Sequence, residues 1–374
     1  MKLCTSGAFG WRKVQGTANR ACGPMDVILM DDPIKVLVVD DALFMRKAIS
    51  EILQSDKSLS VIGTARDGLD GLEKIRQLQP DVVTMDIDMP RMDGLAAIRH
   101  IMIESPVPVV VLSSLFSDGA VTFEALRMGV LDFVPKPSGG ISEDMDKSRR
   151  RIIDRVKIAG SVNFENIRRV RMQTGDLNEN LSVKYGFHPL EYLITLGTTL
   201  SGPNTVIRLL TRLSPIVPAA MVVVQEIAPQ ILPSFVKKFD EHVPWSVTAA
   251  QDGQVLEQGV CYVCSNTQSV HIGRNESDQP CIRISEAVDQ PLNELFISAA
   301  EVFRDKAIGV LLTGVGEDGA DGFARIRENG GDTIAQDSDC CVYPNLTNNA
   351  IEKGTVNTIV DEIRLPGAIA AAMS

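Results

Sequence analysis

The run "IKVLVVD" (residues 34–40) is an almost continuously apolar segment of strand length that stops at an aspartate. Four further short apolar runs follow it, among them "DVVTMDI" (81–87), "VPVVVLSS" (107–114) and "LDFVPK" (131–136), and amphipathic helical segments separate them. Strands that are apolar on both faces and alternate with helices are typical of a parallel sheet covered by helices on both sides. Residues 34–160 are therefore predicted to form a doubly wound, five-stranded α/β domain with a flavodoxin-like fold.

The rest of the chain predicts a second domain. With 374 residues the sequence suits two domains. A second α/β series occupies residues 190–374, and a section of short strands in its middle predicts a hairpin region inserted into a mainly parallel sheet. Residues 161–189 lose the pattern and are predicted to be a linker, whereas residues 1–33 fit no element and are predicted to be a disordered extension.

Charge and composition limit the classes of function. The formal net charge of −11 argues against sequence-independent binding to nucleic acid or to anionic lipid. No apolar stretch is long enough to insert into a membrane, and residues 1–33 lack the apolar core of a signal peptide. The seven cysteines are expected to be reduced, so a cytoplasmic protein is predicted.

Two cysteines, Cys261 and Cys264, raise the question of a metal site. They lie in "VLEQGVCYVCS" (255–265), which reads as a strand. Residues three apart on a strand point to opposite faces, so this pair cannot chelate one ion. Small buried apolar side chains are the better interpretation.

Polar residues of the first domain gather where its predicted strands end. Asp40 and Asp41 follow the first strand, Asp86 the third, Ser113 the fourth and Lys136 the fifth. Ligands of open parallel sheets bind beyond these carboxyl ends. Three converging carboxylates repel one another unless a cation is present, and Mg²⁺ suits such a set because it takes a few carboxylates and keeps several waters. One carboxylate could then attack a phosphoryl group to give an aspartyl phosphate.

The motifs "VVDDALFMR", "DVVTMDIDMPRMDG", "VVVLSS" and "LDFVPKP" resemble those of the receiver domain of bacterial two-component response regulators. The resemblance implies that Asp86 is the phosphoacceptor and that a histidine kinase is its partner. It implies a Mg²⁺ site made by Asp40, Asp41, Asp86 and the backbone carbonyl of Asp88. It further implies that Ser113 is the switch hydroxyl, Phe133 the switch aromatic and Lys136 the phosphate partner, with a cis bond before Pro137.

The second domain is similar to the catalytic domain of the chemotaxis receptor methylesterase family (CheB). The matching stretches include "ITLGTTLSGP", "VVVQEIAPQILPSF" and "AIGVLLTGVGEDGADGFARIRENGGDTIAQD". Family members hydrolyse methyl esters on receptor glutamates and deamidate receptor glutamines, so the resemblance implies methyl-accepting chemoreceptors as partners. In the family, the unphosphorylated receiver covers the active face and phosphorylation uncovers it.

The catalytic motifs of that family are G-A-S-T-G-G-P, V-Q-H-M-P and T-G-M-G-x-D-G. Here the serine position holds Thr199, in "GTTLSGP" (197–203), and the histidine position holds Glu226, in "VVQEIAP" (223–229). The aspartate is kept as Asp318. The alternative role of Asp318 is to cap the helix that follows it. Ser201, two residues after Thr199, could replace the missing serine, but capping the helix near Pro203 is the better interpretation.

These substitutions predict weak or lost hydrolysis. A threonine nucleophile carries an extra methyl group on the attack path. A carboxylate, with an ordinary pKa near 4.3 against about 6.5 for imidazole, is a weak base at neutral pH. Two alternatives stay open: an active protein-glutamate methylesterase that uses Thr199 and Glu226, and a new acid pair of Glu226 and Asp318.

Overall fold

The computed structural model describes residues 32–113, 119–137, 143–162, 189–199, 202–286 and 289–373, with side chains from residue 147 onward in the third range. The predicted extension (1–33) and the predicted linker (161–189) lie almost wholly outside the described residues, as does Ser201. Along the described part of the chain, no helix combines the length and apolar character that crossing a bilayer requires.

The first domain is built on one parallel sheet of five strands in the order β2-β1-β3-β4-β5. The strands are β1 (Ile34–Val39), β2 (Leu59–Ala65), β3 (Val82–Met85), β4 (Val109–Ser113) and β5 (Asp132–Pro135). The order reverses between β1 and β3, so a crevice forms beyond the carboxyl ends of these two strands. The predicted doubly wound, flavodoxin-like sheet is confirmed.

Five helices cover the two faces of this sheet. They are α1 (Leu43–Gln54), α2 (Gly68–Leu78), α3 (Gly94–Glu104), α4 (Gly119–Arg127) and α5 (Glu143–Ser161). Helices α1 and α5 pack on one face through side chains such as Leu53 and Val156. Helices α2, α3 and α4 pack on the other face, through Ile75, Ile98 and Ala125 among others. Burial of the strands on both faces explains their continuous apolar runs.

The second domain contains a seven-stranded parallel sheet in the order β14-β13-β12-β6-β7-β9-β8. Its strands are β6 (Tyr192–Gly197), β7 (Ala219–Gln225), β8 (Ser246–Ala249), β9 (Val260–Ser265), β12 (Ala307–Leu311), β13 (Asp332–Gln336) and β14 (Thr358–Val360). A separate antiparallel pair, β10 (Ser269–Arg274) and β11 (Pro280–Ser285), forms the predicted inserted hairpin region. This combination confirms the predicted architecture of the second domain.

Helices cover both faces of the larger sheet as well. They are α6 (Gly202–Leu210), α7 (Leu232–Asp240), α8 (Pro291–Phe303), α9 (Ala320–Glu328), α10 (Asn345–Glu352) and α11 (Leu365–Ala371). Cys261 is buried in the cluster on the face of α6 and α7, whereas Cys264 is buried in the cluster on the opposite face with α8 and α9. The two thiols therefore point to opposite faces of β9, as expected of a strand, and burial raises the pKa of both.

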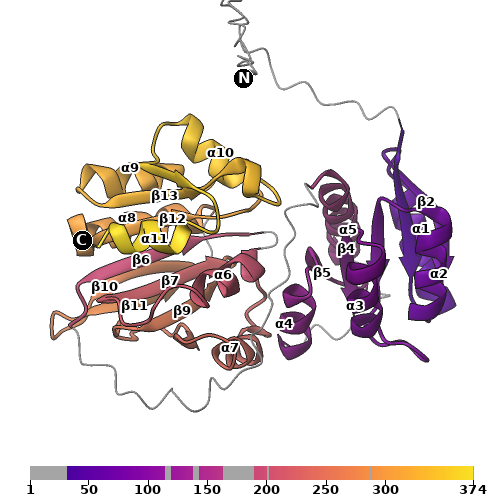
Figure 1. Cartoon of the computed structure of the whole chain (residues 1–374), viewed down its shortest axis with the longest axis horizontal. Helices are drawn as coiled ribbons and strands as arrows, with labels where there is room; N and C mark the ends of the chain where they lie inside the picture. Colours follow the sequence, from indigo (N-terminus) through magenta and orange to yellow (C-terminus); the bar gives the residue numbers. More distant parts are fainter. Residues whose placement is uncertain are drawn as a thin grey trace, which may run out of the picture.

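The two domains contact each other through α4 and α7 (Figure 1). The Phe123 ring of α4 is fully buried and lies 5.6 Å from the ring of Phe235 and 6.0 Å from that of Phe239, both on α7. At the start of α4, the Gly119 amide donates a hydrogen bond of 2.9 Å to the Ser234 hydroxyl. A Cβ at Gly119 would come within 2.3 Å of the Ile231 carbonyl oxygen, so only glycine permits this close approach.

One local prediction about the backbone is wrong. No cis peptide bond occurs among the described residues, which include Lys136 and Pro137. The trans form is favoured by about 0.5–1 kcal/mol even before proline.

Candidate functional site

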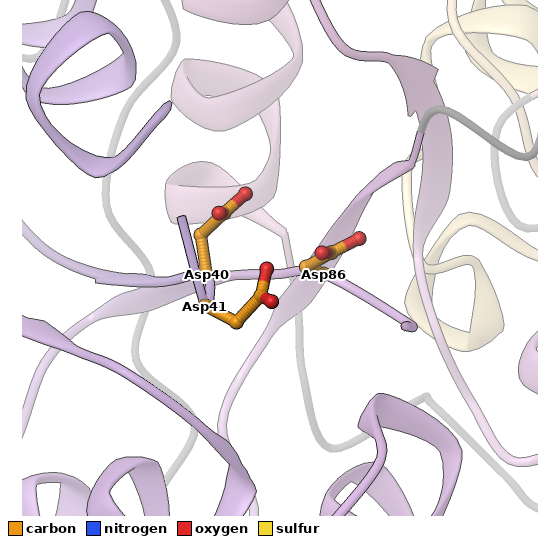
Figure 2. A group of neighbouring side chains, drawn as sticks. All are labelled: Asp40, Asp41 and Asp86. Atoms are coloured by element: carbon orange, nitrogen blue, oxygen red, sulfur yellow. The ribbon is translucent and has the colours of Figure 1, made fainter. Parts of the chain in front are cut away.

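Three carboxylates converge at the crevice of the first sheet (Figure 2). Asp40 and Asp41 follow β1, and Asp86 follows β3, so parallel strands deliver all three to the same edge. One oxygen from each carboxylate lies within 4.8 Å of the others. Oxygen donors at this spacing suit a small divalent cation such as Mg²⁺.

Lys136 contributes the positive charge of this crevice. Its Nζ lies 2.7 Å from Oδ2 of Asp40 and 2.6 Å from Oδ2 of Asp86. Burial raises the pKa of Asp86, and the Lys136 ammonium opposes that effect. For Lys136, burial acts to lower the pKa, but its hydrogen bonds to the two aspartates outweigh burial and raise the pKa. The crevice therefore holds an ammonium group that could bind an anionic oxygen of a ligand.

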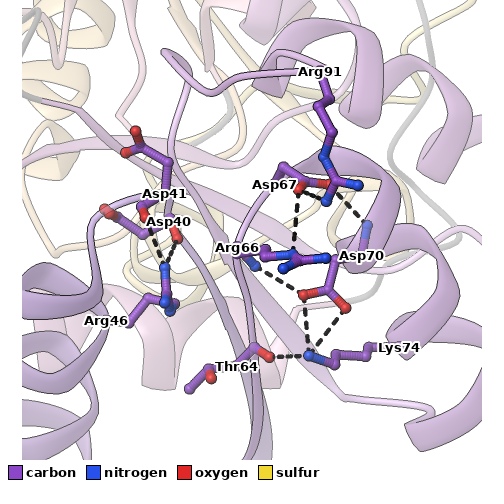
Figure 3. A network of polar contacts seen from close by, with 9 residues as sticks. All are labelled: Asp40, Asp41, Arg46, Thr64, Arg66, Asp67, Asp70, Lys74 and Arg91. Atoms are coloured by element: carbon purple, nitrogen blue, oxygen red, sulfur yellow. Dashed lines mark hydrogen bonds and ion pairs between the residues drawn. The ribbon is translucent and has the colours of Figure 1, made fainter.

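The backbone beside Asp40 and Asp41 is held by Arg46 (Figure 3). Nη1 of Arg46 donates hydrogen bonds to the carbonyl oxygens of Asp40, at 2.7 Å, and Asp41, at 2.9 Å. The Ala42 amide donates to Oδ1 of Asp40 at 2.9 Å. These bonds fix the loop and leave the Asp41 carboxylate exposed at the mouth of the crevice.

The loop from β3 to α3, which contains Asp88, is held by a second ion pair (Figure 3). The Arg91 guanidinium pairs with the Asp67 carboxylate, whose side chain is only 2% exposed. Asp67 also caps α2 by accepting a hydrogen bond of 3.1 Å from the Asp70 amide. Arg91 has a φ of 67°, a left-handed conformation that its side-chain contact helps to maintain.

The close approach of α3 to the end of β3 depends on Gly94. A Cβ at this position would lie 2.1 Å from the carbonyl oxygen of Asp86. Asp93 caps the helix by accepting a hydrogen bond of 2.7 Å from the Ala96 amide. The motif "DMPRMDG" thus builds the crevice wall beside Asp86.

Ser113 and Phe133 lie on the two strands beyond β3. Ser113 ends β4 and is buried, and Phe133 lies in β5 with its side chain largely buried. Strands β4 and β5 pair in parallel, and the Lys136 amide donates to the Ser113 carbonyl oxygen at 3.1 Å. Thus Ser113 lies beside the lysine that contacts Asp86, on the acidic edge of the sheet.

In the second domain, the Thr199 hydroxyl is engaged by the backbone of one residue. Thr199 Oγ1 accepts a hydrogen bond of 2.6 Å from the Val315 amide and donates one of 3.2 Å to the Val315 carbonyl oxygen. Thr199 follows β6 and Val315 follows β12, and these strands are neighbours. The hydroxyl proton is directed to a backbone oxygen rather than to a side-chain base.

Glu226 is bound by the first domain. It follows β7, and its Oε1 pairs with the Arg155 guanidinium of α5. Nε of the same arginine lies 3.3 Å from Oδ2 of Asp132, at the start of β5. Nη2 of Arg151, one turn earlier on α5, lies 4.0 Å from Oε1 of Glu226. The residue in the expected base position is therefore an ion-pair partner between domains.

Asp318 caps a helix, but a different helix from the predicted one. Its Oδ2 and Oδ1 accept hydrogen bonds from the amides of Leu292, at 2.7 Å, and Asn293, at 3.0 Å, in the first turn of α8. The helix that follows, α9, has Gly319 before its first residue and no side-chain cap. The sequence predicts a cap on the helix that follows Asp318 because capping residues commonly precede their helix. In the structure the loop after β12 folds back, so Asp318 caps α8 instead. Burial raises the pKa of Asp318, and the backbone donors oppose that effect.

Thr199 and Glu226 line one cavity of about 830 Å³ between the domains. Side chains of the first domain, among them Leu126, Phe133 and Arg151, complete its wall. Asp318 is not part of the wall and has its own partners on α8. The structure therefore brings together two of the three predicted esterase residues and places the third as a helix cap.

Sequence reasoning missed the cationic half of this interface. Arg151 and Arg155 are four residues apart on α5 and so lie on one helix face. The run "RRRIIDR" contains that spacing, but an exposed helix surface would show the same pattern. The partner of Arg155 in the second domain, Glu226, follows β7, and no residue pattern there indicates a contact between domains.

Comparison with known proteins identifies both halves of the chain. Residues 36–143 match the model described as response regulator receiver domain, and residues 194–369 match the model described as CheB methylesterase. A protein-glutamate methylesterase/protein-glutamine glutaminase of Pyrococcus horikoshii is 35% identical over 353 residues, which cover 92% of this chain and 95% of that protein. A protein of Symbiobacterium thermophilum with the same name is 37% identical, covering 91% of this chain and 97% of its own.

The chain belongs to the CheB methylesterase family. A receiver joined to a CheB domain makes it a methylesterase-type response regulator, and it matches nearly the full length of these relatives. Among solved structures, it is similar to the CheB receiver domain of Thermotoga maritima, with 42% identity, 35% of this chain and 98% of that chain covered, and a TM-score of 0.33. It is also similar to the CheB catalytic domain of the same organism, with 24% identity, 48% of this chain and 96% of that chain covered, and a TM-score of 0.45.

Proposed function

We propose that this CheB-family response regulator accepts a phosphoryl group on Asp86 and that its methylesterase domain hydrolyses weakly or not at all. The observation that carries the second half is the ion pair between Glu226 and Arg155. A group that serves as a general base must reach the proton it removes. Here the carboxylate in the histidine position contacts a guanidinium of the receiver, and the Thr199 hydroxyl donates a hydrogen bond to the Val315 carbonyl oxygen.

For the phosphoryl step, an Asp86 carboxylate oxygen attacks phosphorus and the leaving group departs on the opposite side. Lys136, 2.6 Å from Asp86, binds an equatorial oxygen of the transferred group and stabilises its negative charge. Ser113 supplies a hydroxyl to another of these oxygens after transfer. Asp40, Asp41, Asp86 and the Asp88 carbonyl would hold Mg²⁺, which when bound supplies positive charge beside the phosphoryl oxygens.

The partners follow from the two domains. A receiver takes its phosphoryl group from a phosphohistidine, so a histidine kinase is the proposed donor. Chemoreceptor helices bearing methylated glutamates are the proposed ligands of the methylesterase domain. With hydrolysis weak or lost, the output is competition for phosphoryl groups or occupancy of receptor helices in the cytoplasm.

Phosphoryl uptake tests the receiver half. The purified chain is incubated with acetyl phosphate and Mg²⁺, and phosphorylated protein is separated on a phosphate-affinity gel. The native chain is expected to be labelled, and Asp86→Asn, which removes the attacking oxygen while keeping the shape, is expected to take up nothing. Asp93→Asn, which alters the exposed cap of α3, is the matched control and is expected to be labelled. Persistent labelling of Asp86→Asn would show that the phosphoacceptor lies elsewhere.

The second candidate is an active protein-glutamate methylesterase. One observation favours it: Thr199 and Glu226 line the same cavity, so a hydroxyl and a carboxylate are both present there. This alternative predicts methanol release from methylated receptor membranes that Thr199→Ala abolishes. The proposed function predicts release from the native chain at or close to the background of Thr199→Ala.

A further inference from the structure

A hollow of about 400 Å³ lies at the carboxyl end of β2, the edge strand of the first sheet (Figure 3). Its wall is made by one residue of α1, two at the end of β2 and two of α2, namely Arg46, Thr64, Arg66, Asp70 and Lys74. Helices α1 and α2 cover opposite faces of the sheet, so the hollow straddles the sheet edge. It is separate from the crevice of Asp86, which lies beyond β1 and β3.

The charged side chains of the wall are three cations and one carboxylate. Lys74 and Asp70 form a pair of their own, with Nζ of Lys74 3.0 Å from Oδ1 of Asp70. The same Nζ donates to the Thr64 carbonyl oxygen at 2.5 Å, and Oδ2 of Asp70 accepts a hydrogen bond of 3.0 Å from the Arg66 amide. Because this pair neutralises itself, the positive charge that remains in the hollow is that of Arg46 and Arg66.

These two guanidiniums face little opposing charge. Within the ranges that the structure describes, Arg46 forms no ion pair, and its Nη1 bonds the backbone carbonyl oxygens of the two residues that follow β1. Arg66 has a side chain that is 69% exposed, and its ion pair with Asp67 is long, at 3.9 Å. Asp67 is already paired with Arg91. Two arginines without a close carboxylate can attract an anion from solution, even in a chain with a formal net charge of −11.

The donors in the hollow match a tetrahedral oxyanion. Nε and Nη2 of Arg46 and the guanidinium of Arg66 make no hydrogen bond inside the described part of the chain, and Thr64 adds an exposed hydroxyl. A guanidinium presents a planar fork of N–H donors that fits two phosphate oxygens. A carboxylate has only two oxygens, whereas a phosphate group has enough to bond both arginines and the hydroxyl together. The donor set therefore favours phosphate over a carboxylate.

We propose that this hollow binds a phosphate group, carried by inorganic phosphate or by a small phosphomonoester, between Arg46 and Arg66. Lys74 and Asp70 fix the opposite wall and leave the two guanidiniums to contact the anion. The volume lies at the low end of the range for ligand pockets, about 300–1,000 Å³, which suits a small ligand. Binding here needs neither Mg²⁺ nor phosphoryl transfer to Asp86, so the site stands apart from the proposed function.

Titration of the isotope-labelled full chain with inorganic phosphate tests the site, in buffer without Mg²⁺ and with the arginine Nε–Hε signals followed by NMR. The signals of Arg46 and Arg66 are expected to shift and to reach saturation. Arg66→Gln is expected to raise the dissociation constant for phosphate about tenfold, because it removes one guanidinium and leaves the bonds of Arg46 to the loop after β1 intact. Arg66 is exposed, so an unchanged melting temperature will show that the variant is folded.

Two control variants separate the site from general charge effects. Arg66→Lys keeps the charge but loses the planar fork, so its affinity is expected to lie between those of the native chain and Arg66→Gln. Arg99 is exposed on α3 and has no ion pair among the residues that the structure describes, so Arg99→Gln is expected to bind phosphate as the native chain does. Equal weakening in Arg99→Gln and Arg66→Gln would overturn the proposal, as would equal shifts produced by sodium chloride at the same ionic strength.

Lys136 is the other cation that could attract phosphate, because it lies in the crevice beside Asp86. Lys136→Gln is expected to leave the dissociation constant for phosphate unchanged. Loss of binding in Lys136→Gln together with native binding in Arg66→Gln would place the anion in the crevice and overturn the proposal.

Glycerol phosphate separates the two sources of the phosphate group. Saturable shifts of Arg46 and Arg66 with both ligands would support a site for the terminal group of a phosphomonoester. Shifts with inorganic phosphate alone would support a site for the free anion. If neither ligand shifts these two signals, the hollow is not a phosphate site.

Discussion

The substitution Arg91→Ala tests how much the ion pair between Arg91 and Asp67 stabilises the receiver. Asp67 is 2% exposed, and removal of its partner leaves a buried carboxylate with one backbone donor, the Asp70 amide at 3.1 Å, and the exposed Arg66 at 3.9 Å. Loss of one partner of a fully buried pair costs about 3–5 kcal/mol. Because the Arg91 side chain is 49% exposed and water can reach the gap, we expect about 1–2 kcal/mol.

The same change should weaken Mg²⁺ binding, because Arg91 holds the loop that carries the Asp88 carbonyl. If the loop that carries the Asp88 carbonyl is destabilised by ~1 kcal/mol, the Mg²⁺ dissociation constant rises about fivefold. Urea unfolding measures the stability, and isothermal titration measures the affinity for Mg²⁺. Arg99→Ala, on the exposed surface of α3, is the control and should match the native chain. Native stability and native Mg²⁺ affinity in Arg91→Ala would refute the reasoning.

Two other charged contacts give predictions. Lys136→Gln leaves Asp40 and Asp86 without their shared ammonium, so the melting temperature of the metal-free protein should fall. Addition of Mg²⁺ should then raise the melting temperature of the variant by more than it raises that of the native chain. An equal or smaller increase in calorimetry would contradict this. Glu362→Gln removes the charge that faces Arg208 of α6, in a pair whose side chains are each 8% exposed, and should cost about 3–5 kcal/mol. For a domain of this size the melting temperature should fall by about 10 °C. Glu301 has a side chain that is 59% exposed, so the control Glu301→Gln should change the melting temperature little. Equal shifts in the two variants would rule out a special role for the buried pair.

The sequence predicts the receiver crevice well because its chemistry is local to strand ends. Asp40, Asp86 and Lys136 each follow a continuously apolar run, and a parallel sheet brings such positions to one edge. The structure adds Arg46, whose bonds to the carbonyl oxygens of Asp40 and Asp41 depend on backbone geometry that no residue pattern shows.

The esterase half is less predictable, because its contacts join distant parts of the chain. A motif identifies the positions of Thr199, Glu226 and Asp318, but it cannot show where their side chains bond. Asp318 caps α8, which precedes it in the sequence, and Glu226 pairs with Arg155, 71 residues earlier and in the other domain. Both contacts follow from how loops and domains pack, which lies beyond any local spacing rule.

Methanol release from methylated receptor membranes tests the central claim most directly. The phosphorylated native chain is compared with a variant that carries both Thr199→Ser and Glu226→His. The serine removes the methyl group from the attack path, and the imidazole supplies a base with a pKa near neutrality. We predict background release from the native chain and release at least about 100-fold faster from the variant. Substantial release by the native chain at the rate of the variant would contradict the claim.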